Sequence, residues 1–219
     1  MKKTTTILAS LALGMAAATA GVSPAPAPTG KGVAAPPMDP CAGPISYNNV
    51  ELLYASTDFD GGGDSGDGAI LRVEHSLMEN FYITASASYS DYDYGNTWLL
   101  TAGVGGYVPL SEHIHLAADA GIVYVDWEQD YYTAVKGTTV TRHTISDNDT
   151  GWYVRPHLRA KFGCLTMHAG AQYTDVSDSE DWSWFVNAYY QVAQAWDITA
   201  GYSDADEAQT WTAGVRWRY

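Results

Sequence analysis

The segment from Thr210 to Tyr219, which ends the chain, alternates apolar and polar side chains without interruption. Its apolar face consists of Trp211, Ala213, Val215, Trp217 and Tyr219. A period of two is typical of a β-strand. A strand this apolar would promote aggregation if it were left as an exposed edge in water. The segment therefore predicts a last strand that closes a β-barrel.

The segment 1–20 has the features of a secretory signal peptide. Lys2 and Lys3 precede an apolar run, and Ala18-Thr19-Ala20 fits the small-residue cleavage pattern before Gly21. The run is too short for a transmembrane helix, and no later stretch reaches about 18 consecutive apolar residues. We therefore expect an exported protein that would enter a membrane only as strands.

The segment 21–45 is rich in Pro and Ala and predicts an extended periplasmic linker. From residue 46 onward, clusters of Gly, Asp, Ser and Asn divide the chain into pieces that each carry a face of period two. These pieces predict ten strands, at 46–57, 68–77, 81–90, 98–108, 113–127, 152–162, 165–174, 182–192, 196–203 and 210–219. The predicted domain is thus an all-β, antiparallel up-and-down barrel over 46–219, and an even strand number places both of its ends on the same side of a membrane.

The connections between the predicted strands fall into two kinds. Those after the even-numbered strands are short, whereas those after the odd-numbered strands are longer and polar, at 58–67, 91–96, 128–150, 177–181 and 204–208. Most of the 25 acidic residues lie in or beside the longer connections. Short periplasmic turns and long outer loops are typical of outer-membrane barrels.

Basic residues within the predicted strands are confined to one face. Six of the 11 basic residues lie in strands, all opposite the apolar face: Arg72, Arg155, Arg159, Lys161, Arg216 and Arg218. A charge that faces lipid near the midplane costs about 2–4 kcal/mol, so this distribution indicates a polar lumen and a lipid-facing exterior. A soluble barrel, the alternative, would carry its charges outside. Aromatic residues near both ends of the apolar face predict two interfacial girdles.

The end of the chain, Thr212-x-Gly214-x-x-Trp217-x-Tyr219, resembles the C-terminal β-signal of bacterial outer-membrane β-barrel proteins. The resemblance implies recognition by the barrel-assembly machinery. In architecture the rest of the chain is similar to small OmpA-like and opacity-like barrels. Those groups usually have eight strands, so eight is the alternative to our count of ten.

A barrel of about ten strands is largely filled by its own side chains. We expect a lumen charge network that acts as a polar plug, with Arg159 opposite His168, Asp119 beside an arginine, Glu51 near Arg216 or Arg218, and Glu74 with Arg72 one strand away. The full set of network residues is Glu51, Arg72, Glu74, Asp119, Arg155, Arg159, Lys161, His168, Arg216 and Arg218. The alternative is a narrow, anion-favouring pore lined by Arg155, Arg159 and Arg216.

Two other kinds of site are weaker hypotheses. Asp58, Asp60, Asp64 and Asp67 offer oxygen ligands that suit Ca²⁺, although their spacing is not that of an EF-hand, and a solvated loop is the simpler interpretation. We predict no other cofactor.

A hydrolase with its active site in a loop is a further alternative. His143 and Ser146, with Asp147 or Asp149, would be its residues, but catalysis needs a fixed geometry that a flexible loop does not provide. His113 and His115 share one strand face without an evident third metal ligand. We therefore expect no enzymatic activity.

The chain has two cysteines, Cys41 before the first strand and Cys164 in a turn on the same side of the barrel. Because an exported protein meets an oxidising compartment, we predict a disulfide that ties the linker across the periplasmic mouth.

The net charge of −14, which becomes −16 once Lys2 and Lys3 are removed, argues against a nucleic-acid partner. We predict an integral outer-membrane protein, with both barrel termini in the periplasm, that contacts outer-membrane lipid and lipopolysaccharide. Its acidic outer loops favour a structural or adhesin-like role with an extracellular ligand or surface partner.

Overall fold

A computed structural model describes residues 41, 43–59, 65–93, 95–135, 139–177, 179–206 and 208–219. The predicted signal peptide and nearly all of the predicted linker lie outside these residues. None of the described residues forms a helix with the length and hydropathy that crossing a membrane requires.

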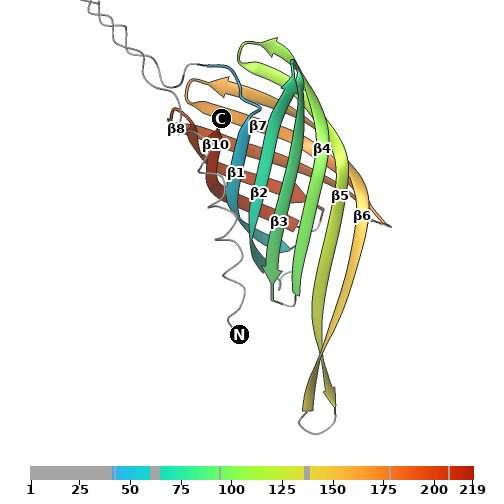
Figure 1. Ribbon diagram of the computed structural model, residues 1–219. Coiled ribbons are helices and arrows are strands. Elements are labelled where there is room, and N and C mark those ends of the chain that lie inside the picture. The colour runs from blue at the N-terminus through green and yellow to red at the C-terminus, as the bar shows by residue number, and fades with distance from the viewer. Residues whose placement is uncertain are drawn as a thin grey trace, which may run out of the picture. The chain divides into compact units, whose positions relative to one another are not determined.

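The described chain is a closed barrel of antiparallel strands in up-and-down order, in which β1 pairs with both β2 and β10 (Figure 1). The predicted barrel and its ten strands are confirmed. The strands are β1 (Asn49–Phe59), β2 (Ser65–Met78), β3 (Phe81–Tyr92), β4 (Gly95–Ser111), β5 (Ile114–Val135), β6 (Thr139–Phe162), β7 (Leu165–Val176), β8 (Ser179–Ala193), β9 (Trp196–Ala205) and β10 (Ala208–Arg218).

The two ends of the barrel differ in their connections. We call the end where β1 begins and β10 ends the terminal end, and the opposite end the loop end. At the terminal end, two-residue turns join consecutive strands, and Asn80 and Gly163 adopt positive φ angles of 69° and 58° in two of them. Asn and Gly are the residues that take this left-handed conformation at the lowest cost, which explains their place in these turns.

The prediction of a long loop over 128–150 is wrong. β5 and β6 stay paired from Ile114↔Ala160 as far as Val135↔Thr139, and the resulting hairpin projects beyond the rest of the loop end (Figure 1). The segment is rich in Thr, Tyr, Val and Ile, which favour strands, but its polar residues lie on both faces. A search for an apolar face therefore misses it.

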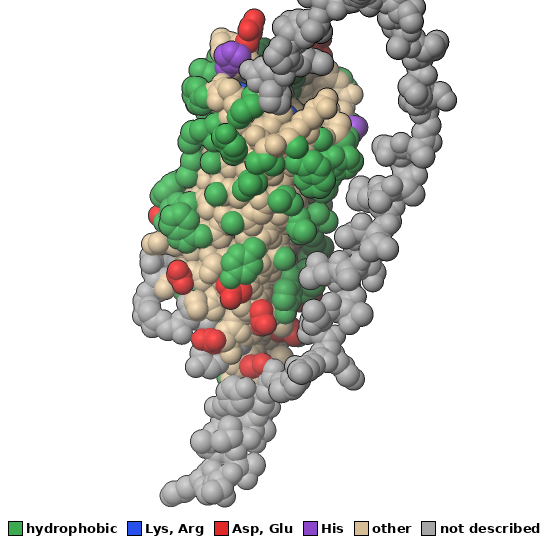
Figure 2. Space-filling model, turned by 90° about the vertical axis from the view of Figure 1, so that its left-hand side faces the viewer, with side chains coloured by type: hydrophobic (Ala, Val, Ile, Leu, Met, Phe, Trp, Pro, Cys, Tyr) green, Lys and Arg blue, Asp and Glu red, His purple; other side chains and the backbone are tan. Residues whose placement is uncertain are grey.

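The outward and inward faces of the barrel have opposite polarity. Outward side chains such as Val104 and Ile122 are 64% and 63% exposed, whereas the inward Arg159 is 1% exposed. Apolar side chains cover much of the wall in Figure 2, and acidic side chains gather toward its lower end. This polarity is the reverse of a water-soluble protein and matches a wall surrounded by lipid.

Outward-facing aromatic rings form a girdle on the loop-end side of the wall. Ring centroids lie 4.9 Å apart for Tyr89 and Trp98, and 4.5 Å apart for Tyr202 and Trp211. Similar contacts join Trp152 to Tyr173, Tyr173 to Trp182, and Trp184 to Tyr202. These are the amphipathic rings that favour a membrane–water interface.

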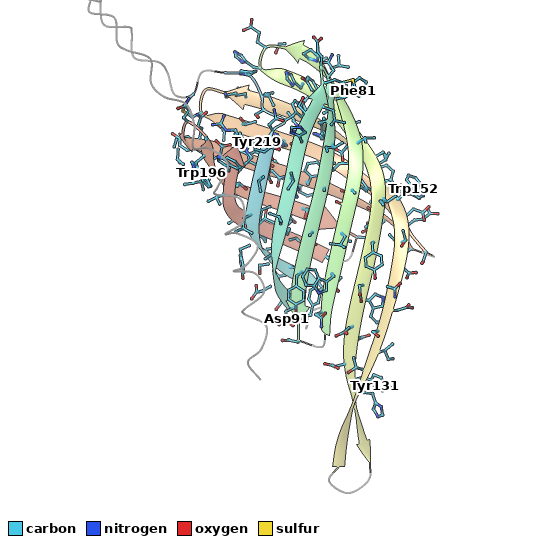
Figure 3. All side chains as sticks on the ribbon, in the orientation of Figure 1. Phe81, Asp91, Tyr131, Trp152, Trp196 and Tyr219 are labelled. Atoms are coloured by element: carbon cyan, nitrogen blue, oxygen red, sulfur yellow. A yellow bond between two sulfur atoms is a disulfide. The ribbon has the colours of Figure 1, made fainter. Side chains whose placement is uncertain are left out.

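A second group of aromatic residues lies at the terminal end, where Figure 3 shows Phe81, Trp196 and Tyr219. From Phe81 to Tyr89 the chain advances about 26 Å along β3, at about 3.3 Å per residue. With a strand tilt of about 40°, this separation covers most of an apolar band about 25 Å tall. The two girdles are therefore spaced to bracket a hydrocarbon layer.

Candidate functional site

A buried ion pair crosses the centre of the lumen. Arg159 on β6 donates from Nη1 to Oε2 of Glu74 on β2 (2.9 Å) and from Nη2 to Oε1 of Glu74 (2.7 Å). β2 and β6 are not neighbours in the barrel, so this two-point contact links opposite parts of the wall. Asn49 donates to Glu74 (3.0 Å), and Nε of Arg159 donates to Nε2 of His157 (2.9 Å). Each of the three guanidinium nitrogens of Arg159 thus donates one hydrogen bond, two of them to the same carboxylate.

Arg72, on the same strand as Glu74, contacts Glu51 on β1, with Nη1 3.1 Å from Oε2. The contact between Glu74 and Arg159 was not predicted from the sequence. A sequence pattern shows which residues face inward, but it does not show which of them meet across a closed lumen.

An aromatic layer lies on the terminal-end side of this ion pair. The Arg159 guanidinium lies 4.3 Å from the ring centroid of Tyr47 and 5.3 Å from that of Tyr82, as in cation–π contacts. Tyr47 stacks on Tyr107 at 4.2 Å, and its hydroxyl lies 3.2 Å from Nδ1 of His115. Burial raises the pKa of Tyr47, so its phenol stays protonated.

Gly105 on β4 makes room for this aromatic layer. A Cβ atom at Gly105 would overlap the ring of Tyr82, which is fully buried. The glycine is therefore required by the close approach of an aromatic ring to the strand backbone.

The predicted disulfide between Cys41 and Cys164 is present, with the two Cα atoms 4.7 Å apart. It anchors the segment before β1 to the turn between β6 and β7. Ile45 and Tyr47 of this segment are buried, and Nζ of Lys161 donates to the carbonyl oxygen of Gly43 (2.8 Å). The chain before β1 is thus held across the terminal end of the lumen.

Two further groups of charges line the wall. Arg155 on β6 contacts Asp119 on β5 through both oxygens, at 2.9 and 3.2 Å. Arg216 on β10 lies 2.6 Å from Asp197 on β9, and its guanidinium covers the ring of Tyr189 at 3.7 Å. The expected position of Asp119 beside an arginine is thus observed.

The expected position of Glu51 near Arg216 is observed. Glu51 is in register with Arg216, but the carboxylate that contacts Arg216, and also Arg218 at 3.2 Å, is that of Asp197. Asp197 was not among the predicted site residues, although its pairing with Arg216 across the β9–β10 hairpin could have identified it. His168 is in register with Arg159, as expected, and its ring packs on Tyr189 at 4.6 Å.

On the loop-end side of the central ion pair, the lumen holds a cavity of about 240 Å³. Its wall combines small hydroxyl-bearing side chains with aromatic and apolar ones, and its floor includes the guanidinium groups of Arg72, Arg155 and Arg159. The lumen therefore has two parts, a packed part at the terminal end and a polar, hollow part toward the loop end.

The residues proposed for calcium binding are only partly described. Asp58 lies near the end of β1, and Asp67 on β2 accepts a hydrogen bond from the Tyr54 hydroxyl. Asp60 and Asp64 lie outside the described residues. Within the described ranges, no group of three His, Cys, Asp or Glu side chains is arranged to hold a metal ion.

The hydrolase candidates do not converge. His143 and Ser146 lie three positions apart on the extended strand β6, so they face opposite sides of the hairpin, and His143 stacks on Tyr131 at 5.0 Å. Asp149 bonds the Ser177 hydroxyl instead. His113 lies in the exposed turn before β5, whereas His115 belongs to the buried aromatic layer.

The residues of the predicted assembly signal occupy both faces of β10. Thr212 lines the cavity, and a Cβ atom at Gly214 would overlap the carbonyl oxygen of Leu52 on β1. Trp217 is in register with Trp196, and the Tyr219 hydroxyl lies 3.3 Å from Nδ1 of His75. Gly214 therefore has a structural reason as well, since β10 and β1 approach closely where the barrel closes.

The closed antiparallel wall, apolar outside and charged inside, defines the protein as a transmembrane β-barrel.

Comparisons with known proteins give structural likeness alone. No family model matches the sequence, and no curated protein matches it. Among solved structures, the chain is similar to the KdgM porin in complex with disordered oligogalacturonate (12% identity, 78% of this chain and 99% of that chain, TM-score 0.43). It is also similar to the translocator domain of the autotransporter NalP from Neisseria meningitidis (11% identity, 78% and 87%, TM-score 0.47). A third similar structure is the attachment invasion locus protein Ail of Yersinia pestis (11% identity, 78% and 95%, TM-score 0.37).

Proposed function

We propose that this protein is an integral outer-membrane barrel with a sealed lumen, which serves as a structural and surface-interaction module rather than as a channel. The observation that carries the proposal is the Glu74–Arg159 ion pair, because it spans the lumen and is buried. The aromatic layer beneath it and the disulfide-anchored segment before β1 add two further barriers. Ions would have to displace all three to cross.

The surface role is supported by the loop end. The β5–β6 hairpin extends past the last residues that pair with β4 and β7, and its described side chains Tyr131 and Ile145 are 44% and 50% exposed. Acidic side chains gather toward the same end on the face that Figure 2 shows. A projecting hairpin on a rigid barrel is a suitable support for contacts with an extracellular partner. The barrel-assembly machinery and outer-membrane lipid, including lipopolysaccharide, are the other proposed partners.

The narrow anion-favouring pore is the competing function. The arginines of the lumen favour it, but all five arginines of the predicted charge network already contact a carboxylate: Arg72, Arg155, Arg159, Arg216 and Arg218. Paired charges neutralise one another, and the buried Glu74–Arg159 pair occupies the space that an ion needs to cross the lumen. The sealed barrel therefore explains the geometry better.

Planar-bilayer recording tests the seal. We expect the purified, folded protein to give no stable conductance steps, because the central ion pair and the aromatic layer leave no water path. A large open porin inserted into the same bilayer serves as the positive control. Reproducible steps that vanish when the protein is heat-denatured before reconstitution would contradict the sealed lumen.

Cysteine labelling on intact cells tests the orientation. We expect a Tyr131→Cys variant to react with a membrane-impermeant maleimide on whole cells, because Tyr131 lies on the projecting hairpin (Figure 3). The matched variant Leu110→Cys, whose residue is 61% exposed near the terminal end, should react only after the outer membrane is permeabilised. The reverse pattern would show that the loop end faces the periplasm and would remove the surface role.

A further inference from the structure

We propose that the cavity on the loop-end side of the lumen is a dead-end binding site for a small oxyanion, a carboxylate or phosphate group, held by Arg72, Arg155 and His168. This site is distinct from the surface role of the hairpin and does not depend on it. It is also not a conduction path, because the Glu74–Arg159 ion pair forms its floor.

The first support is the orientation of the ion pairs around the cavity. The side chains of Arg72 and Arg155 are 21% and 18% exposed, whereas those of their partners Glu51 and Asp119 are 2% and 0% exposed. Both arginines line the cavity and neither partner carboxylate does. Each pair therefore presents its positive end to the hollow part of the lumen, with its negative end behind.

The second support is unused hydrogen-bonding capacity. Arg72 makes one contact, through Nη1, so its Nε and Nη2 donors have no partner among the described residues. Arg155 uses Nε and Nη2 on Asp119 and leaves Nη1 without a partner in the same part of the chain. Guanidinium groups with free donors recognise planar carboxylates and phosphates.

The third support is His168. Its side chain lines the cavity and the residue is only 5% exposed, yet the buried Nε2 atom has no hydrogen-bond partner within the described ranges. Burying a polar atom without a partner is costly, and such atoms call for an explanation. An oxyanion bound at the floor of the cavity, or the water that it orders, would supply the partner that the chain does not.

The character of the ligand follows from the lining. Among the described residues, Glu74 is the only one whose carboxylate faces the cavity, and its oxygens are already occupied by Arg159 and Asn49. Donors are therefore in excess at the floor. The wall above offers hydroxyl groups that can both donate and accept: Ser86, Ser88, Thr101, Ser203, Thr210 and Thr212. A ligand with one anionic group and several hydroxyl groups matches both regions.

A titration followed by nuclear magnetic resonance tests the site. Protein folded in detergent micelles and labelled with ¹⁵N at arginine is titrated at constant ionic strength with D-gluconate, inorganic phosphate or the neutral polyol sorbitol. We expect the Nε–Hε signals of Arg72 and Arg155 to shift saturably with gluconate or phosphate, with half-saturation on the order of a millimolar. Sorbitol should produce no saturable shift, and the tighter of the two anions identifies the preferred oxyanion.

Matched variants locate the binding. The double variant Arg72→Gln with Glu51→Gln removes the guanidinium without leaving a buried carboxylate unpaired, and should raise the half-saturation concentration about tenfold. Ser88→Asp should weaken binding through repulsion, whereas Ser88→Asn, of similar size, should not, so this pair tests the site even if the double variant fails to fold. Arg218→Gln, at the terminal end and outside the cavity lining, should leave half-saturation unchanged.

Three outcomes would overturn the proposal: shifts that rise linearly without saturation, equal shifts with gluconate and sorbitol, or equal weakening by Arg218→Gln and by the cavity variants. Recording the same preparation in planar bilayers separates this proposal from the sealed lumen. Saturable binding in a conducting protein would refute the sealed lumen and leave the binding site intact. A protein that shows neither conductance nor saturable binding would refute the binding site and leave the sealed lumen intact.

Discussion

Replacing either Arg159 or Glu74 alone by Ala should lower the free energy of unfolding by about 3–5 kcal/mol, because each change leaves the other charge buried without its partner. Urea unfolding in lipid vesicles, followed by heat-modifiable gel mobility, measures the effect. We expect it to be among the largest effects of any single substitution in the lumen, since the pair links β2 to β6 across the barrel.

The double variant Glu74→Leu with Arg159→Met provides the internal control for this prediction. It removes both charges and replaces them with apolar side chains that still fill the space. The free energy of unfolding should therefore fall by much less than the sum of the two single-variant losses. Asn49 and His157 lose hydrogen-bond partners in this variant, so we expect a residual cost of about 1–3 kcal/mol. Additive costs would show that the two side chains are not coupled and that the pair does not form.

Val104→Arg should destabilise the folded protein by about 2–4 kcal/mol, because Val104 lies near the middle of the apolar band of β4 and is 64% exposed on the outward face. In a water-soluble barrel the same change at so exposed a position would alter stability by no more than about 0.5 kcal/mol. Equilibrium unfolding in vesicles gives the value directly.

The control is an Arg substitution at a different depth in the membrane, where the loss of stability should be smaller. Asp91→Arg introduces the same side chain near the loop end of β3, where Figure 3 shows Asp91, and should cost about 0–1 kcal/mol. Equal costs at Val104 and Asp91 would mean that lipid does not surround the wall, and the transmembrane assignment would fail.

The wall of the barrel could be predicted because the pattern of each strand depends only on what lies on its two faces. A strand between lipid and a polar lumen must alternate strictly, and this alternation is visible residue by residue, as in Trp211 to Tyr219 or Trp152 to Phe162. The long hairpin of β5 and β6 escaped the same reasoning because beyond the rim neither face meets lipid, so nothing imposes an apolar face there.

The candidate site could be predicted only as a list of inward-facing charges. Asp119 was placed beside an arginine because its strand and the arginine-bearing strand are neighbours in the sequence, and Arg155 is the arginine that it contacts. Glu74 and Arg159 were not predicted to contact each other, because they meet across the lumen from strands that are not paired with one another. Asp197 was overlooked although its register with Arg216 makes it a direct cross-strand neighbour.

By itself, the sequence determined the ten-strand transmembrane wall, the inward direction of its charges and the cysteine pair that anchors the segment before β1, because each depends on alternation along one strand or on the side of the membrane that a turn must face. Only the tertiary structure decided which charges meet, which part of the lumen is packed, and where a cavity remains. Those features depend on closure of the barrel, since closure alone brings β1 beside β10 and sets β2 opposite β6.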